Sequence, residues 1–394
     1  MSKFYVPFSK LLFLSLLGFS FLLAACEGKD QSQNPNQSQS RSGESMEIYL
    51  ENMPKVELHL HLDGTLSPEI TAIIATRNNL DYFTTAEEVR ESLASRPSGL
   101  MGFLEHHFKS QEVMLTKQDF QDAVYSLTEN LKQNNVIYAE IFFDPQTHTS
   151  RGIKFADVIE GIDAGRKAGA QDFGVQLNLI ICINRERSVS SAMEMLDQAK
   201  PYKHLIVGLG MDSGPEYGNP PVKFKDVYAR ARTEDYKLTA HADVDVRDTL
   251  VHIRQLLNDI KVDRIDHGLN ASDDPELMKE LTAHSMCLTG SPVKRKSDPQ
   301  LQDIDRITTL DKNGVCISMH TDDPEEFESG YLNNMMKQFA HSSGYSKADM
   351  TRLMYNAYTA MWQPEAQKRA YMDGLKKYAK GGGIAWDDVV TTAN

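Results

Sequence analysis

The chain has 394 residues, of which 41% are apolar, and a formal net charge of -13. This length and apolar content are enough for one large domain or two ordinary ones with a real hydrophobic core. The acidic balance argues against binding nucleic acid or anionic lipid through a basic face.

The first 25 residues have the pattern of a secretory signal peptide: two lysines, an apolar run over 11–23, and then small residues. The run is shorter than the roughly 20 residues that a bilayer span needs, which disfavours an uncleaved anchor helix. LAAC at 23–26 resembles the lipobox of bacterial lipoproteins, in which the cysteine is acylated. We therefore expect Cys26 to carry a lipid and to become the mature N-terminus.

Residues 26–45 contain the lipidation candidate and a polar, low-complexity stretch, which is typical of a flexible tether. The folded domain is expected over 46–394. Removing residues 1–25 takes away two lysines and no acidic residue, so the charge goes from -13 to -15. The prediction is a domain outside the cytoplasm, tethered by Cys26 to a bacterial membrane on the periplasmic side or at the cell surface.

From residue 46 onward, short β-rich runs alternate with longer amphipathic stretches of helical periodicity. The candidate strands are 55–62, 136–143, 175–183, 204–211, 236–242, 262–268, 285–291 and 314–321. This alternation predicts a (β/α)8 TIM-type barrel, with a helical insertion over 68–134 after the first strand. The alternative is a doubly wound open sheet, but no glycine-rich phosphate loop follows the first strand.

Polar residues stand at the carboxyl ends of four predicted strands, where a barrel places its chemistry. They are His59 and His61 on strand one, His241 on strand five, His267 on strand six and Asp322 after strand eight. Three of these four histidines together with the carboxylate are a suitable ligand set for Zn²⁺. A metal held in this way lowers the pKa of bound water and supplies hydroxide.

Each of these signals is weak alone. A His-x-His pair on a strand is more often cross-strand packing, and an Asp-Asp-Pro sequence is more often a loop or a helix cap. Their joint occurrence at four strand ends favours one metal site. Other histidines lie off this pattern and are interpreted as surface or core residues: His106, His107, His148, His204, His252, His284 and His341. His320 could face either the pocket or the helical layer.

At these residues the sequence resembles the adenosine and adenine deaminase family of the amidohydrolase superfamily. PKVELHLHLDGTL (54–66), RIDHG (264–268) and TDDP (321–324) are similar to its motifs on strands one, six and eight. FFDPQTHTSRGI (142–153), GMDSGPEYGNPPVKF (210–224) and GYLNNMMKQF (330–339) resemble the bacterial and fungal adenine deaminase branch.

The resemblance implies that one zinc ion is bound by four side chains: His59, His61, His241 and Asp322. His267 would orient the hydroxide and take its proton. Asp323 would bind the N7 edge of a purine, and the backbone from Gly210 through Asp212 to Ser213 would line another edge. His61 and Asp63 would also lie at the substrate.

The family's acid, which protonates ring N1 while hydroxide adds to C6, is a glutamate three residues after the fifth-strand histidine. Val244 stands there in this chain and cannot move a proton. We expect Asp245 to replace it after a one-residue shift of the loop. Asp243 is the second candidate, or a partner of a ligand histidine. The third interpretation is that both are solvated loop residues.

Two further departures lie near the expected pocket. Lys294 and Arg295 replace a Ser-Asn pair and could bind an anionic substrate, although a solvated loop is favoured; His320 replaces a small polar residue. Cys182, Cys287 and Cys316 lie in short apolar runs without a CxxC spacing. Their odd number favours buried free thiols over a disulfide framework or a cysteine metal site.

The sequence therefore predicts a zinc-dependent hydrolase that converts an aminopurine to its 6-oxopurine and releases ammonia or an amine. Adenine, adenosine or an N6-substituted relative would be the substrate. The expected partners are this small molecule and the membrane. The alternative is a catalytically silent lipoprotein that binds a purine or a metal on the same fold.

Overall fold

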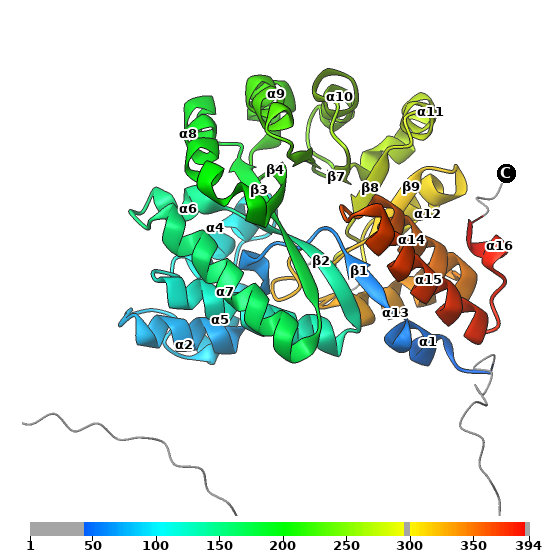
Figure 1. Ribbon diagram of the computed structural model, residues 1–394, viewed down its shortest axis with the longest axis horizontal. Helices are drawn as coiled ribbons and strands as arrows, with labels where there is room; N and C mark the ends of the chain where they lie inside the picture. The colour runs from blue at the N-terminus through cyan, green and yellow to red at the C-terminus, as the bar shows by residue number, and fades with distance from the viewer. Residues whose placement is uncertain (1–42, 295–299, 391–394) are drawn as a thin grey trace, which may run out of the picture. The chain divides into compact units, whose positions relative to one another are not determined.

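The structure is a computed structural model that describes residues 43–294 and 300–390. Its centre is a set of parallel strands with helices around the outside (Figure 1). The strands are β1 (Lys55–Glu57), β2 (Val136–Phe143), β3 (Gln176–Asn184), β4 (Ile206–Asp212), β5 (Lys237–Leu238), β6 (His241–Ala242), β7 (Ile265–His267), β8 (Cys287–Gly290) and β9 (Cys316–Met319).

The strands follow one another in chain order as parallel neighbours, β1 to β5 in one sheet and β6 to β9 in another. β5 and β6 are two pieces of the single strand expected over 236–242. The N–H of Asp266 donates to the carbonyl of Ala240 between them (3.0 Å), which joins the two sheets. A parallel bridge between Leu60 and Asp322 joins the first strand to the last. The predicted (β/α)8 barrel is confirmed.

Four helices between β1 and β2 form the insertion expected over 68–134. They are α2 (Pro68–Arg77), α3 (Ala86–Ser95), α4 (Leu100–Gln111) and α5 (Lys117–Gln133). Serine and threonine side chains at the N-caps start three of them, because Ser67 and Thr85 accept backbone N–H groups and Thr116 forms a capping box with Asp119.

The remaining helices cover the outside of the barrel. They are α1 (Met46–Asn52), α6 (Pro145–Thr149), α7 (Phe155–Phe173), α8 (Val189–Ala199), α9 (Lys225–Thr233), α10 (Thr249–Arg254), α11 (Pro275–Ala283), α12 (Ile304–Lys312), α13 (Leu332–Ser343), α14 (Lys347–Ala360), α15 (Glu365–Gly381) and α16 (Trp386–Val390). Glycines let α7 approach α5 closely, since a Cβ at Gly161 or Gly165 would lie within 2.5 Å of a backbone oxygen of α5.

A buried ionic group lies in the barrel interior. The Arg264 guanidinium donates to Glu140 (2.7 Å) and to the carbonyl of Leu58 (3.0 Å), and it lies over the Trp362 ring at 4.2 Å. A buried charge is tolerated only when its partners are in place. These contacts therefore tie the first, second and sixth strands of the barrel together.

The expectation of three free cysteines was wrong for two of them. Cys287 and Cys316 form a disulfide, whereas Cys182 is free and buried. The two bonded residues are direct neighbours in the parallel register of β8 and β9. The register brings together thiols 29 residues apart in sequence.

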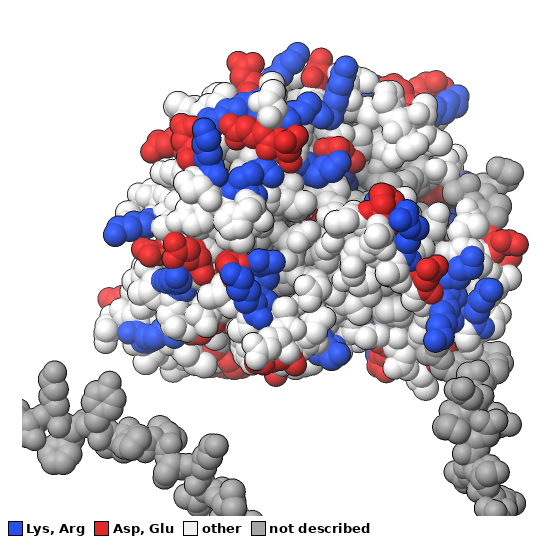
Figure 2. All heavy atoms as spheres, in the orientation of Figure 1, with Lys and Arg blue, Asp and Glu red and all other residues white. Residues whose placement is uncertain are grey.

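The predicted signal peptide, Cys26 and the tether up to residue 42 lie outside the described residues, as does Arg295. No helix within 43–294 and 300–390 has the length and apolarity to cross a membrane. On the face shown in Figure 2, acidic and basic side chains are interspersed. That face carries no continuous basic patch of the kind that binds a nucleic-acid backbone.

Candidate metal centre and active site

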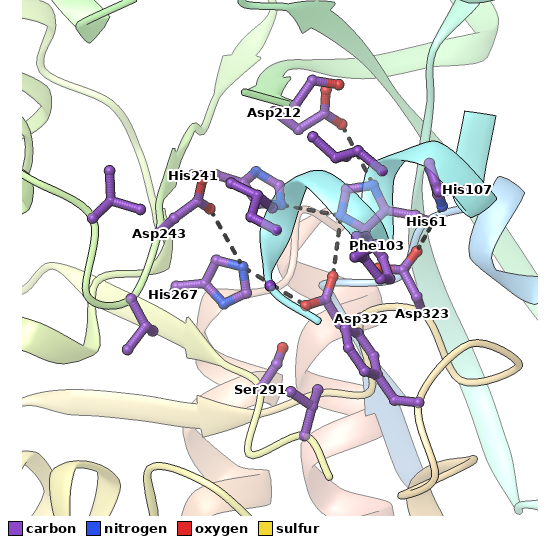
Figure 3. A pocket seen from close by; sticks show the side chains of 18 of the residues that line it. His61, Phe103, His107, Asp212, His241, Asp243, His267, Ser291, Asp322 and Asp323 are labelled. Atoms are coloured by element: carbon purple, nitrogen blue, oxygen red, sulfur yellow. Dashed lines mark hydrogen bonds and ion pairs between the residues drawn. The ribbon is translucent and has the colours of Figure 1, made fainter. Parts of the chain in front are cut away.

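The strand ends bring the predicted metal ligands to one point. His59 and His61 follow β1, His241 begins β6 and Asp322 follows β9. One ligand atom from each of these four residues lies within 4.8 Å of the other three. Figure 3 shows His61, His241 and Asp322 pointing toward one another from separate strands.

In each of His59, His61 and His241, the Nδ1 atom points away from the proposed metal position and faces a hydrogen-bond acceptor. Nδ1 of His59 lies 2.9 Å from the carbonyl of Thr289, and Nδ1 of His241 lies 3.0 Å from the carbonyl of Met211. Nδ1 of His61 lies 3.4 Å from a carboxylate oxygen of Asp212. An acceptor at Nδ1 holds the proton there, so the Nε2 lone pair of each ring is free to bind a metal.

The Nε2 atoms of the histidines and Oδ1 of Asp322 lie as far apart as ligands of one metal ion do. Nε2 of His61 and Nε2 of His241 are 3.0 Å apart, and Oδ1 of Asp322 is 3.3 Å from Nε2 of both His59 and His61. Ligands about 2.0–2.2 Å from a tetrahedral ion lie roughly 3.3 Å from one another. The Nε2 atom of His59 is fully buried and has no hydrogen-bond partner among the described residues. This donor set fits a divalent metal.

The backbone at two site residues is in the left-handed region, with φ of 56° at His267 and 64° at Asp322. Residues other than glycine adopt this conformation at a cost of order 1–3 kcal/mol. The turn at Asp322 is held by its two backbone bonds to the first strand, from its N–H to His59 and to its carbonyl from His61. This left-handed backbone conformation turns the side chains of His267 and Asp322 into the site.

A cavity of about 410 Å³ opens above the predicted ligands. One part of its wall is acidic and contains Asp144, Asp212 and Asp243. The insertion supplies an apolar part through α4, where Phe103 stacks against Phe327 with ring centroids 5.1 Å apart. A cavity of this size, with few polar groups among apolar ones, suits a small heterocyclic molecule.

The structure separates the two aspartates that flank Val244. Oδ1 of Asp243 lies 3.8 Å from Nε2 of His267, as the dashed line in Figure 3 shows. Burial, with repulsion from Glu216 added, raises the pKa of Asp243 to about 7. Glu216 also accepts the backbone N–H of Asp243 (2.7 Å), which fixes the loop.

Asp245 also lines the cavity, and the expectation that it takes the glutamate's place stays a prediction. Its carboxylate forms an ion pair with Arg306 (2.7 Å), and its side chain is 63% exposed. Its backbone is left-handed, with φ of 59°, and its N–H is held by Asn270. Val244 itself lines the cavity.

The residues predicted to bind substrate fall into two groups. His61, Asp212, Ser213 and Asp323 line the cavity, whereas Asp63 and Gly210 do not. Asp63 is buried, with one carboxylate oxygen 3.8 Å from His148. Gly210 faces the barrel interior, where a Cβ would lie 2.7 Å from the sulfur of Cys182.

His107 is a pocket residue that the sequence analysis placed on the surface or in the core. It reaches the cavity from α4, and its Nδ1 lies 2.9 Å from Glu326 and 3.8 Å from Asp323. Burial opposes its charge, but Glu326, Asp323 and Asp63 together outweigh burial and raise the pKa of His107 to about 10. The position of His107 in the sequence does not predict that it lines the pocket, because the path of the insertion decides whether it reaches the barrel mouth.

His320 is resolved as a core residue. Its Nδ1 accepts the N–H of Leu58 (3.1 Å) and its Nε2 faces Ser318 (2.9 Å), so it ties the last strand to the first. Burial lowers the pKa of His320 well below its usual value, which keeps the imidazole neutral.

Lys294, the other departure near the expected pocket that the structure describes, forms an ion pair with Glu328 at 3.1 Å.

The chain is similar to known proteins over most of its folded part. The family model described as adenosine deaminase matches residues 54–378. The chain belongs to the adenosine deaminase family. An adenine deaminase from Chlorobium luteolum is 37% identical over 336 residues, which are 84% of this chain and 97% of the relative.

Two solved structures have the same fold. An adenine deaminase from Arthrobacter aurescens has a TM-score of 0.74 at 29% identity, over 83% of this chain and 99% of that chain. An amidohydrolase from Burkholderia ambifaria, with bound Zn, has a TM-score of 0.76 at 23% identity, over 87% of this chain and 96% of its own. This member of the adenosine deaminase family is a metal-dependent purine deaminase, which favours the enzyme over a silent binding protein.

Proposed function

We propose that the enzyme uses one zinc ion to hydrolyse the exocyclic amine of adenine, with adenosine and N6-substituted adenines as the other candidates. The observation that carries this proposal is the convergence of Nε2 of His61 and His241 with Oδ1 of Asp322 on one point. The donor set of three imidazoles and one carboxylate is typical of Zn²⁺. Relatives named adenine deaminase support adenine as the nucleobase that is hydrolysed.

His59, His61, His241 and Asp322 would hold the zinc ion, which would supply the Lewis acidity that makes water a nucleophile near neutral pH. The reaction forms a bond from water oxygen to C6 of the purine, breaks the C6–N6 bond and releases ammonia or an amine. His267 takes the proton of the attacking water, because its Nε2 faces the cavity between Asp243 and Asp322 at 3.8 and 3.7 Å.

Addition of water to C6 also requires a proton at ring N1, since negative charge would otherwise collect on the ring. We assign this proton transfer to Asp243. Its carboxylate lines the cavity beside His267, and its backbone is held by Glu216. The apolar side chain of Val244 then packs against the ring rather than exchanging a proton with it.

We also propose that the enzyme acts outside the cytoplasm, anchored to the membrane through lipidated Cys26. The signal-like pattern of the first 25 residues and LAAC at 23–26 support this proposal. The disulfide between Cys287 and Cys316 supports it independently, because disulfides persist in oxidising compartments. Loss of membrane association in Cys26→Ser would test the anchor.

The substrate is tested by purifying the full chain in detergent, loading it with Zn²⁺ and following purine absorbance and ammonia release. Adenine, adenosine and N6-methyladenine are compared at equal concentrations. The expected result is turnover of adenine with a higher kcat/KM than that of either other purine. Zinc-loaded enzyme that turns over none of the three would contradict the proposed function.

A further inference from the structure

A second group of metal-binding side chains lies at the ends of β2, β3 and β4, apart from the four predicted ligands. Asp144 follows β2, Cys182 lies in β3 and Asp212 ends β4. One carboxylate oxygen from each aspartate and the sulfur of Cys182 lie within 4.8 Å of one another. The parallel register sets Cys182 beside Gly210, two residues before Asp212, which brings these distant residues together.

The charges in this group are buried and poorly compensated. Asp144 and Asp212 are each 4% exposed and Cys182 is fully buried. Oδ1 of Asp144 has no hydrogen-bond partner among the described residues, whereas Asp212 pairs with His61, whose Nδ1 lies 3.4 Å from its carboxylate. An uncompensated buried carboxylate costs several kcal/mol, so the group requires protons or a cation.

We propose that Asp144, Cys182 and Asp212 bind a second divalent cation of the zinc type. A thiolate with two carboxylates selects a borderline-soft ion over Mg²⁺ or Ca²⁺, which prefer oxygen alone. Binding breaks the S–H bond of Cys182, forms a sulfur–metal bond and passes the proton to solvent. The expectation that Cys182 is a buried free thiol is confirmed, and such a thiol is available to a metal.

Asn184 lies next to the group and is hydrogen-bonded to it. Its Nδ2 donates to Oδ2 of Asp144 (3.0 Å), which places its side chain at the group. Its Oδ1 is fully buried and lacks a hydrogen-bond partner among the described residues. Nδ2, and not Oδ1, faces Asp144, so the amide must turn over before its oxygen can serve as a fourth donor.

Two further features of the barrel are consistent with this second site. Gly210 leaves room for the sulfur, since a Cβ there would lie 2.7 Å from it. Asp212 belongs to the second site, and one of its oxygens also faces Nδ1 of His61. Figure 3 marks the contact with His61 by a dashed line. An ion bound to Asp212 therefore holds it against His61 and orients that imidazole, which makes Asp212 a positioning residue.

The test is to load the full chain with Co²⁺ and to measure the bound metal and the near-ultraviolet absorbance. The four ligands of the first site contain no sulfur, so a cobalt–thiolate charge-transfer band can come only from an ion bound to cysteine. We expect two ions per chain and this band. Cys182→Ser should lose the band and one ion, whereas His241→Ala should keep the band and lose the other ion.

Asp144→Asn is the second variant, because it keeps the sulfur and nearly the same shape and removes one charge. We expect it to weaken binding of the second ion by at least about tenfold, a shift read from a cobalt titration of the band. One ion per chain without a sulfur band, or a band that survives Cys182→Ser, would overturn the proposal. These measurements do not depend on purine turnover, so they stand whether or not adenine is the substrate.

Discussion

Nε2 of His61 and Nε2 of His241 face each other at 3.0 Å, although the two residues are 180 positions apart in the chain. The other nitrogen of each ring lies near an oxygen acceptor, on Asp212 and Met211 respectively. At this distance the two nitrogens share either a proton, as an N–H···N hydrogen bond, or a cation. A carboxylate oxygen of Asp322 also lies 3.3 Å from Nε2 of His61, and this added donor makes the arrangement suitable for a metal ion.

Replacing His241 by alanine should remove both the metal and the activity. The remaining three ligands cannot hold the ion in the same geometry, so we expect metal affinity to fall by more than about 100-fold and turnover to fall with it. Metal analysis and an ammonia assay measure the two effects. His284→Ala is the matched control, because that histidine is exposed and lies outside the site. Full metal content in His241→Ala would contradict the assignment.

The fold and the metal ligands could be predicted from sequence because both depend on local patterns. Alternating strand and helix signals specify the barrel, and strand ends necessarily meet at its mouth. His59, His61, His241 and Asp322 therefore come together without any knowledge of loop paths.

Other features depend on contacts that the sequence does not reveal. Asp245 forms an ion pair with Arg306, from a later helix, and no pattern near Asp245 signals this pair. The disulfide depends on the lateral register of β8 and β9, and the spacing of its cysteines gives no signal of it. His107 reaches the pocket from an insertion whose path is set by helix packing.

The disulfide between Cys287 and Cys316 should stabilise the barrel. It closes a loop of 29 residues, for which chain entropy predicts about 3–4 kcal/mol. Urea unfolding with and without reductant, followed by circular dichroism, measures this contribution. The double variant Cys287→Ala/Cys316→Ala should unfold at lower urea and should not respond to reductant. An unchanged midpoint in the reduced wild-type protein would contradict the prediction.

The ion pair between His107 and Glu326 should make stability depend on pH. The pKa of His107 is raised to about 10 in the folded protein, against about 6.5 for an unfolded histidine. A raised pKa means that the stabilisation is fully present below pH 6.5 and is lost as the pH rises toward 10. The loss should be on the order of 5 kcal/mol, because each pKa unit is worth about 1.4 kcal/mol.

His107→Gln isolates this effect. Buried Lys55 acts in the opposite direction, because burial lowers its pKa to about 7 and stability then increases with pH. The difference in unfolding free energy between wild type and His107→Gln cancels the contribution of Lys55. We expect the difference to be largest near pH 6.5 and to shrink toward pH 10. A difference that stays constant with pH would show that the His107–Glu326 pair is not charged.

The last prediction separates the two aspartates beside Val244. Asp243→Asn keeps the shape of the side chain but cannot deliver a proton, so kcat should fall by about 10²–10⁴-fold while the metal stays bound. Asp245→Asn loses only a partly exposed ion pair with Arg306, which is worth about 0–1 kcal/mol, so kcat should change little. Steady-state kinetics with metal analysis of both variants decides between them. If Asp245→Asn stops turnover and Asp243→Asn does not, the loop must rearrange when substrate binds, and Asp245 is the proton donor.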